Sequence, residues 1–434
     1  MRKYTNLPNL LKPNHSVLAI FLACLIFQGC EFGMYGDDTS LRDSEDTILA
    51  MRGKGAKDYE IWALDQGAGL SRIHIYNSSL EETDVIDFTK LFAHGELEKE
   101  VTMPHMIEFN STYEYAAIAS PASGNVAIIR ASDREVIEII ETGAGAHMAS
   151  FTPDDKSIWV ANIGTVTFTE ITADLTSESF AKGRELDLTK DPEWKDKFKG
   201  VEGGGGGDLD LKKSVSAPVC HEYTADGAFA YLTLGPGAGG LVVVDILSGK
   251  PKIVKAFSPE EVKANCGLAR SRDGRKMYAN WGDPGDEDNP PAQSGEWYVF
   301  NTSNHTLIKS STDTRGVDAH GARVSPRGPW LWQVNRGSDN GIVINTQVDR
   351  IVHTLNDVGS SPDILDFSPD GKFAFISLRG PNPISGAAHV ATGETPGFSV
   401  INTSNRRKIA VIQPAPIEDR EASDFHGIKV RSIN

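Results

Sequence analysis

Metal-binding side chains recur at one position of a repeated sequence unit. In units such as "HMASFTPDDKSIWVAN", an apolar strand leads through a PDG-type turn into a second strand. At the position seven residues before the turn Asp, or its aligned equivalent, six of seven units hold His, Cys or Asp. The seventh unit holds Val219 there and His221 two residues later, and a shift of two residues keeps a strand side chain on the same face. The candidate metal ligands are therefore His105, His147, His221, Cys266, His320, Asp363 and His426.

Chance does not account for these histidines. With 11 His in 434 residues, about 0.2 would be expected at seven equivalent positions of a repeat, and four are present. A lone histidine at a strand start usually bonds a nearby carbonyl, and duplication can copy one that has no role. Because the repeat units differ at most other positions, a histidine without a function should have been replaced in most of the copies. Imidazole ligands suit copper, zinc, iron or nickel, and a thiolate favours copper or zinc.

The elements that must position these residues are β-strands. The unit recurs roughly every 40 to 50 residues, as four-stranded propeller blades do. The predicted fold class is all-β, a seven-bladed β-propeller over residues 48–434. The last strand, "HGIKVRSIN" (426–434), aligns with a first strand, and residues 59–88 supply second, third and fourth strands. We expect both chain ends to share one blade, which closes the ring and removes a free sheet edge. The first strand of each blade is innermost, so the candidate ligands should meet around the central channel.

The strand motifs resemble those of the YVTN-repeat propeller family. "WVAN", "YANW" and "WQVN" match its second strand, and "VVVDI", "IVINT" and "SVINT" match its third. The resemblance covers nearly the whole chain from about residue 48 and implies the fold rather than a function. The histidine ring distantly resembles the propeller cradle that holds the catalytic copper cluster of nitrous oxide reductase. Here only the idea of a ring matches, without the paired His motif or the cupredoxin domain of that family, so nitrous oxide reduction is not expected.

The start of the chain predicts export and a lipid anchor. Positive residues precede the short apolar run "SVLAIFLACLIF" (16–27), and "FQGC" ends at Cys30. This pattern resembles the bacterial lipoprotein signal, which implies residues 1–30 as the signal, lipidation at Cys30 and a tether over 31–47. The alternative is an ordinary secretory leader. The expected location is the periplasm or cell surface. The net charge of −16 excludes a nucleic-acid-binding surface, and we expect a monomer.

Other features of the sequence say less about function. Cys220 and Cys266 could form a disulfide, which would remove Cys266 as a ligand. Insertions at 186–215 and 282–296 are predicted to be loops. Several charged residues near blade heads could meet an anionic ligand, but we interpret them as solvated or paired surface charge: Glu222, Arg270, Arg323, Arg336 and Arg379.

Three function classes follow. The first is an exported, lipid-anchored propeller that holds a transition metal, copper before zinc, for metal handling or for redox chemistry as a metal-dependent oxidoreductase. Its partner would then be a small-molecule substrate or a redox protein. The second is a metal-free binding scaffold. The third is a hydrolase or isomerase acting on a small sugar lactone, which Ile163 disfavours, because lactonases of this fold tend to carry an acidic residue there.

Overall fold

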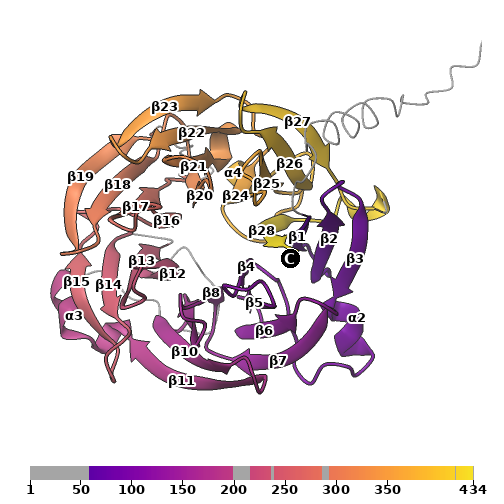
Figure 1. The fold of residues 1–434 in the computed structure, drawn as a ribbon, viewed down its shortest axis with the longest axis horizontal. Coiled ribbons are helices and arrows are strands. Elements are labelled where there is room, and N and C mark those ends of the chain that lie inside the picture. Colours follow the sequence, from indigo (N-terminus) through magenta and orange to yellow (C-terminus); the bar gives the residue numbers. More distant parts are fainter. Residues whose placement is uncertain (1–57, 199–215, 236–238, 286–292, 416, 434) are drawn as a thin grey trace, which may run out of the picture. The chain divides into compact units, whose positions relative to one another are not determined.

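Seven antiparallel sheets of four strands each surround a central channel (Figure 1). The computed structural model describes residues 58–198, 216–235, 239–285, 293–415 and 417–433. Six blades are built from strands that are consecutive along the chain, the seventh combines β28 with β1, β2 and β3, and one strand of each blade lies nearest the channel. The predicted fold is confirmed. The signal, Cys30 and the tether lie outside the described residues.

The strands of the first four blades follow the chain in order. Blade 1 contains β4 (Met106–Phe109), β5 (Tyr115–Ser120), β6 (Asn125–Arg130) and β7 (Glu135–Glu141). Blade 2 contains β8 (Ala146–Phe151), β9 (Ser157–Asn162), β10 (Thr167–Asp174) and β11 (Ser179–Asp187). Blade 3 contains β12 (Ala217–Tyr223), β13 (Phe229–Gly235), β14 (Leu241–Asp245) and β15 (Lys252–Phe257). Blade 4 contains β16 (Leu268–Arg270), β17 (Lys276–Trp281), β18 (Glu296–Asn301) and β19 (Thr306–Asp313).

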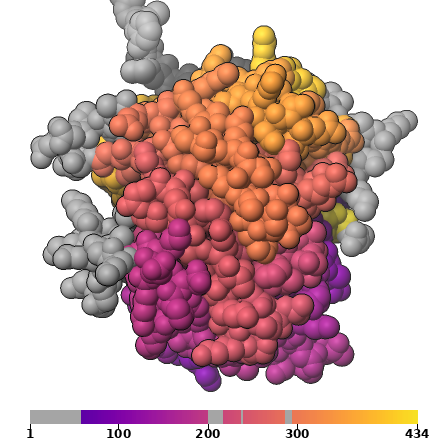
Figure 2. All heavy atoms as spheres, turned by 90° about the vertical axis from the view of Figure 1, so that its left-hand side faces the viewer, coloured from indigo at the N-terminus to yellow at the C-terminus, as the bar shows by residue number. Residues whose placement is uncertain are grey.

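The last three blades complete the ring. Blade 5 contains β20 (Ala319–Val324), β21 (Trp330–Asn335), β22 (Asn340–Asn345) and β23 (Arg350–Leu355). Blade 6 contains β24 (Pro362–Phe367), β25 (Phe373–Leu378), β26 (Gly397–Asn402) and β27 (Arg407–Ile412). Blade 7 contains β28 (Phe425–Ser432), β1 (Tyr59–Asp65), β2 (Arg72–Asn77) and β3 (Glu82–Asp87). Neighbouring blades form a continuous outer surface from β15 to β23 (Figure 2).

Blade 7 joins the two ends of the described chain. β28 is its innermost strand and pairs with β1 in antiparallel register, from Tyr59 opposite Ser432 to Asp65 opposite Phe425. The backbone N–H of Asp424 donates to the Asp65 carboxylate at 2.8 Å, just before this pairing starts. The expected closure by both ends is therefore confirmed, and blade 7 has no open inner edge.

The turn between the first two strands explains the repeated sequence motif. In four blades a Ser or Thr hydroxyl donates to the turn Asp two residues later, at 2.6–2.9 Å. The residue that follows has φ between 58° and 73° and is Asp or Gly, because few other residues adopt this left-handed conformation. These residues are Asp155, Gly227, Gly274 and Gly371. The motif therefore encodes a turn.

A β-bulge interrupts five of the inner strands. The register between first and second strands shifts in blades 2, 3, 5, 6 and 7, each time at the candidate-ligand position. A bulge places one extra residue in a strand and re-aims the side chains around it. The inner strand can therefore direct one side chain into the channel before it returns to the regular in-and-out alternation.

Six short helices accompany the strands in the part of the chain that the structure describes. They are α2 (Phe88–Ala93), η1 (Leu188–Lys190), α3 (Pro192–Lys197), η2 (Arg336–Ser338), α4 (Ala388–Ala391) and η3 (Ile417–Asp419). Among the described residues, no helix is both long and apolar enough to cross a lipid bilayer.

The start of the predicted loop 186–215 is ordered structure, which corrects that expectation. β11 continues to Asp187, and α3 packs against β15. Trp194 and Phe198 stack at 5.3 Å and are buried in the core of blade 3. Two large aromatic side chains supply enough buried apolar surface to fix this segment.

Candidate metal centre

Six candidate ligands and Val219 form a ring layer in the channel. The structure places one residue of each blade at the same point of its inner strand, and we call these seven residues the ring layer: His105, His147, Val219, Cys266, His320, Asp363 and His426. His105 and His426 stack with ring centroids 3.5 Å apart, and His105 meets His147 at 4.4 Å. Residues more than 300 positions apart in sequence therefore touch, as the closed ring predicts.

A glycine follows three of the ring-layer residues for a steric reason. A Cβ atom at Gly267, Gly321 or Gly427 would lie 2.3–2.6 Å from the carbonyl oxygen of the ring-layer residue in the next blade. No side chain fits at that distance, so only glycine lets adjacent inner strands approach so closely. The dipeptides Cys-Gly and His-Gly are thus the signature of a tightly constricted channel.

Hydrogen bonds fix the tautomers of His105 and His147. His147 Nδ1 lies 2.9 Å from the carbonyl oxygen of Val219, which can only accept, so Nδ1 carries the proton. His105 Nδ1 lies 2.7 Å from Gln66 Oε1. The Gln66 amide nitrogen faces the Asp424 carboxylate at 2.9 Å, which fixes the amide orientation and makes His105 Nδ1 a donor.

Two nitrogen lone pairs consequently face each other. His105 Nε2 and His147 Nε2 are 2.9 Å apart, and in neutral rings with Nδ1 protonated neither has a proton to share. Burial lowers the pKa of His147 to about 4, and burial with the nearby His426 and His147 lowers the pKa of His105 well below its usual value. Around a tetrahedral ion, two imidazole nitrogens at 2.0–2.1 Å from the metal lie about 3.3 Å apart. A small opening of this pair would admit a metal ion.

A second group of ligands lies beside this pair. One ligand atom from each of His320, Asp363 and His426 lies within 4.8 Å of the others, so these residues could hold a metal ion. His426 Nδ1 lies 3.0 Å from the backbone oxygen of His105 and must donate to it, which leaves Nε2 as an acceptor 3.5 Å from Asp363 Oδ1. Burial lowers the pKa of His426 well below its usual value, although Asp363 opposes this shift.

His320 is the charged member of this group. Its Nε2 lies 2.8 Å from Asp363 Oδ1. Burial and Arg336 lower its pKa, but Asp363 and Cys266 outweigh them and raise the pKa of His320 to about 9. A metal that binds His320 through Nε2 would therefore displace a proton.

Two buried arginines orient Asp363. Arg379 Nη1 and Arg336 Nη1 lie 2.8 Å and 3.4 Å from Asp363 Oδ2, which leaves Oδ1 facing the two imidazoles. Arg379 also binds Asp424, whose carboxylate holds Gln66 and, through it, His105. Arg336 also binds Asp318 at 2.7 Å. Second-sphere contacts of this kind hold metal ligands in position.

The sequence interpretation of these arginines needs correction. Arg379 has no exposed surface, Arg336 is buried, and Arg323 is half-buried and paired with Glu108 and Asp366. The expectation that they are paired therefore holds for all three, whereas Arg336 and Arg379 are buried rather than at the surface. Gln66 and Asp424 escaped prediction, because neither belongs to the repeat and both approach the site only through ring closure.

His221 does not join the ring layer, which corrects its prediction as a ligand. Its Nε2 lies 2.6 Å from Ser150 Oγ, and its ring packs against Phe168 and Tyr223 in the core. Pro218 pairs with Leu234 and His221 with Leu232, so Val219 and Cys220 both stand opposite Thr233. This bulge reverses the two-residue alternation. His221 thus takes the place that the core residues Leu365 and Ile428 take in blades 6 and 7.

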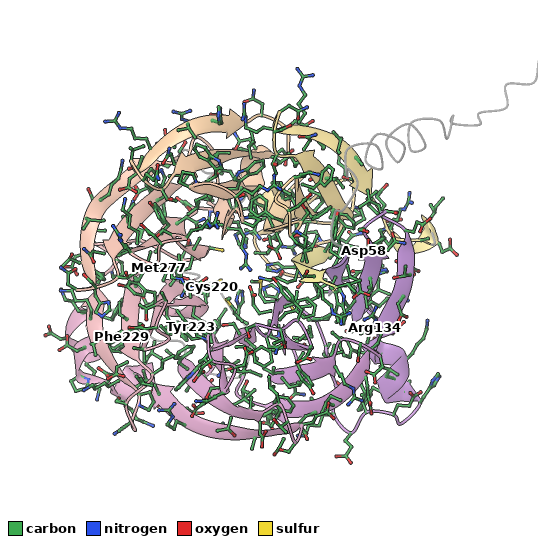
Figure 3. All side chains as sticks on the ribbon, viewed as in Figure 1. Asp58, Arg134, Cys220, Tyr223, Phe229 and Met277 are labelled. Atoms are coloured by element: carbon green, nitrogen blue, oxygen red, sulfur yellow. The ribbon has the colours of Figure 1, made fainter. Side chains whose placement is uncertain are left out.

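Cys220 approaches the ring layer in place of His221. Both Cys220 and Cys266 are buried free thiols in the structure. A hydrogen bond with Cys220 and burial raise the pKa of the Cys266 thiol well above its usual value, while His320 opposes the shift. Figure 3 shows Cys220 at the inner wall of the ring.

Below the ring layer, the next residue of every inner strand lines a cavity of about 50 Å³. These residues are Met106, Met148, Cys220, Gly267, Gly321, Ile364 and Gly427. The fold and the site together define a β-propeller with a candidate metal centre in its channel.

Comparisons with known proteins support the fold alone. No family profile matches the chain, and no curated protein matches it. The chain is similar to the structure of a candidate 6-phosphogluconolactonase from Bacteroides fragilis, with 13% identity and a TM-score of 0.59 over 87% of this chain and 99% of that one. It is also similar to hydrazine synthase of Kuenenia stuttgartiensis, with 14% identity and a TM-score of 0.51 over 79% and 90% of the two chains. At such identities a shared fold does not carry a shared function.

Proposed function

We propose that this protein is an exported, lipid-anchored β-propeller that binds a transition metal ion in its central channel, with copper as the expected ion. The observation that carries the proposal is the pair of facing acceptors, His105 Nε2 and His147 Nε2, 2.9 Å apart. Two lone pairs at this distance repel each other, and a shared cation removes the repulsion. His320, Asp363 and His426 supply further ligands of the kind that copper and zinc accept.

The channel residues support metal binding more directly than they support a particular reaction. The chain orients His105, His147 and His426 through hydrogen bonds at Nδ1, and it buries His105 and His426. A bound copper ion would supply one-electron redox chemistry; zinc would supply none. Storage or delivery of the ion requires only that these residues bind it. A redox role requires a reaction partner as well, so metal handling is the proposal with fewer assumptions. The sequence motifs support placing the blades with YVTN-type propellers.

Metal analysis of protein purified without a His tag tests the proposal. After exposure to Cu(II) or Zn(II) and removal of free metal, we expect about one ion per chain. The double variant His147→Ala/His320→Ala should fall below about one ion per ten chains, because it removes a ligand from both groups.

The matched control is His353→Ala, an exposed histidine on β23 that should leave metal content unchanged. Wild-type protein that stays metal-free would favour a polar-lined binding scaffold. Full occupancy in the double variant would place the metal elsewhere.

A further inference from the structure

The cavity below the ring layer has an unusual concentration of sulfur. Met106, Met148 and Cys220 follow one another around its wall from three consecutive blades, and Cys266 of the next blade also lines it. A volume of about 50 Å³ exceeds the 10–15 Å³ that one water needs, so the cavity can hold an ion. The proposed imidazole and carboxylate ligands lie in the layer above and do not account for this sulfur.

The backbones that carry the two thiols are held together by one hydroxyl. The Thr233 hydroxyl donates to the backbone oxygen of Cys266 at 2.8 Å and lies 3.3 Å from the backbone nitrogen of Cys220, which donates to it. Both cysteines are 5% exposed, and both line the cavity. One hydroxyl therefore ties adjacent blades together at the point where each contributes a cysteine to the cavity wall.

We propose that Cys220 and Cys266 form a second, soft-metal site that takes Cu(I), with the thioethers of Met106 and Met148 in the same cavity wall. Thiolate and thioether sulfur select monovalent copper over harder ions. The inference rests on the proposed metal-binding function and adds a site of different ligand type beside the ring layer. On binding, two S–H bonds break, two copper–sulfur bonds form and two protons leave to solvent, while copper stays monovalent.

The position of the bulge in blade 3 gives this proposal its structural basis. In blades 5 and 7 the residue after the ring-layer residue is Gly321 or Gly427, whereas blade 3 has Cys220 at that point. Val219 occupies the ring-layer position of blade 3 and contributes only its carbonyl oxygen, to His147. Blade 3 thus offers its ligand to the cavity rather than to the ring layer.

Titration with acetonitrile-stabilised Cu(I), without oxygen and after reduction of the protein, tests this site. The full chain with Cys24→Ser/Cys30→Ser, which keeps only the two channel cysteines, should bind one equivalent through sulfur, in addition to any copper that the ring layer takes. X-ray absorption at the copper edge should show sulfur atoms among the nearest neighbours of the metal. Adding Cys220→Ser/Cys266→Ser should weaken Cu(I) binding by at least about a hundredfold, since even second-sphere changes cost 10- to 100-fold, and should remove the sulfur shell.

The remaining outcomes overturn the proposal. They are an absence of Cu(I) binding, a copper spectrum without sulfur, or unchanged Cu(I) affinity in the Cys220→Ser/Cys266→Ser protein. Zn(II) binding and the circular dichroism spectrum of the same variant separate this result from the function proposed above. If the parent protein binds Zn(II) but its copper spectrum shows no sulfur neighbours, the soft-metal site is rejected and the ring-layer site stands. Loss of Zn(II) binding in folded parent protein rejects the ring-layer site instead.

Discussion

Two layers of polar side chains fill the channel, and they differ in how their charges and lone pairs are compensated. An ion-pair layer lies three residues further along the inner strands than the ring layer, and it contains Glu108, Arg323, Asp366 and Lys429. Arg323 lies 3.2 Å from Glu108 and 3.3 Å from Asp366, and Lys429 pairs with Glu108. Each of these four charges lies beside an opposite charge, and Glu222, at the same position of blade 3, adds a third carboxylate to the layer. In the ring layer, by contrast, the acceptors of His105 and His147 face each other.

The comparison shows what distinguishes a ligand site from structural polarity. Both layers are buried and rich in ionisable groups, so neither burial nor polar content separates them. In the ring layer, Asp363 Oδ1 lies 2.8 Å from His320 Nε2, but the Nε2 atoms of His105, His147 and His426 have no proton to donate. Unprotonated ring nitrogens that share one layer are prepared for a cation, whereas the four named charges of the ion-pair layer already lie beside opposite charges.

The largest expected effect contrasts Asp363→Asn with Glu108→Gln. Each change removes the charge of a buried carboxylate, and breaking a buried ion pair costs about 3–5 kcal/mol. The free energy of unfolding in urea should therefore fall in both variants, by about 3 kcal/mol for Asp363→Asn because Arg336 and Arg379 keep second partners. Only Asp363→Asn should also weaken metal binding. Equal metal affinities of the two variants would contradict the distinction between the layers.

A second contrast sets His147→Ala against His221→Ala. Both histidines stand near the start of an inner strand, but only His147 faces another imidazole. We expect His147→Ala to weaken metal binding at least about a hundredfold. His221→Ala should leave metal affinity unchanged and cost about 2–4 kcal/mol of stability, because it leaves a cavity in the core. Calorimetric titration and urea unfolding measure the two quantities, and a metal-binding defect in His221→Ala would restore His221 as a ligand.

The smallest expected effect concerns a buried histidine, His74, whose charge is neutralised by neighbouring carboxylates, as the charges of the ion-pair layer are neutralised by one another. His74 lies between Asp65 and Glu82; burial lowers its pKa, but both carboxylates outweigh burial and raise it. A raised folded-state pKa stabilises the fold fully below the unfolded value near 6.5, and this stabilisation is lost as pH rises through the folded-state pKa. Stability should thus decline above about pH 6.5, by about 1.4 kcal/mol for each unit of pKa shift.

His74→Gln should flatten this decline, and urea unfolding across pH 6 to 9 measures it. An unchanged slope in the variant would assign the dependence to other groups. The imidazoles of His105, His147 and His426 predict no matching decline over that range, because their pKa values are lowered rather than raised. His320, whose pKa is raised to about 9, contributes a decline of the same sign, which should remain in the His74→Gln variant.

Most of the architecture could be predicted because each blade repeats the same local signals. The Asp turn and the strand period both act within a few residues, and the closure of blade 7 followed from strands missing at each end. The ring-layer positions of His105, His147, Cys266, His320, Asp363 and His426 followed from the same alignment.

The errors arose where local alternation failed or where contacts were non-local. The bulge at Val219 and Cys220 cannot be seen in alternation alone, so His221 was assigned to the wrong face. Arg336 and Arg379 looked like ordinary loop charges, because their partners Asp318, Asp363 and Asp424 come from other parts of the chain. A glycine directly after Cys266, His320 and His426 was the available signal for the constriction.

Ring closure by β28 also has a consequence for the order of assembly. His426 lies on this strand, and its Nδ1 holds the backbone of His105 while Gln66, next to β1, holds the His105 ring. A metal ion bound as proposed would therefore couple its binding to ring closure, and an ion that binds the closed form more tightly would stabilise that form further as its free concentration rises.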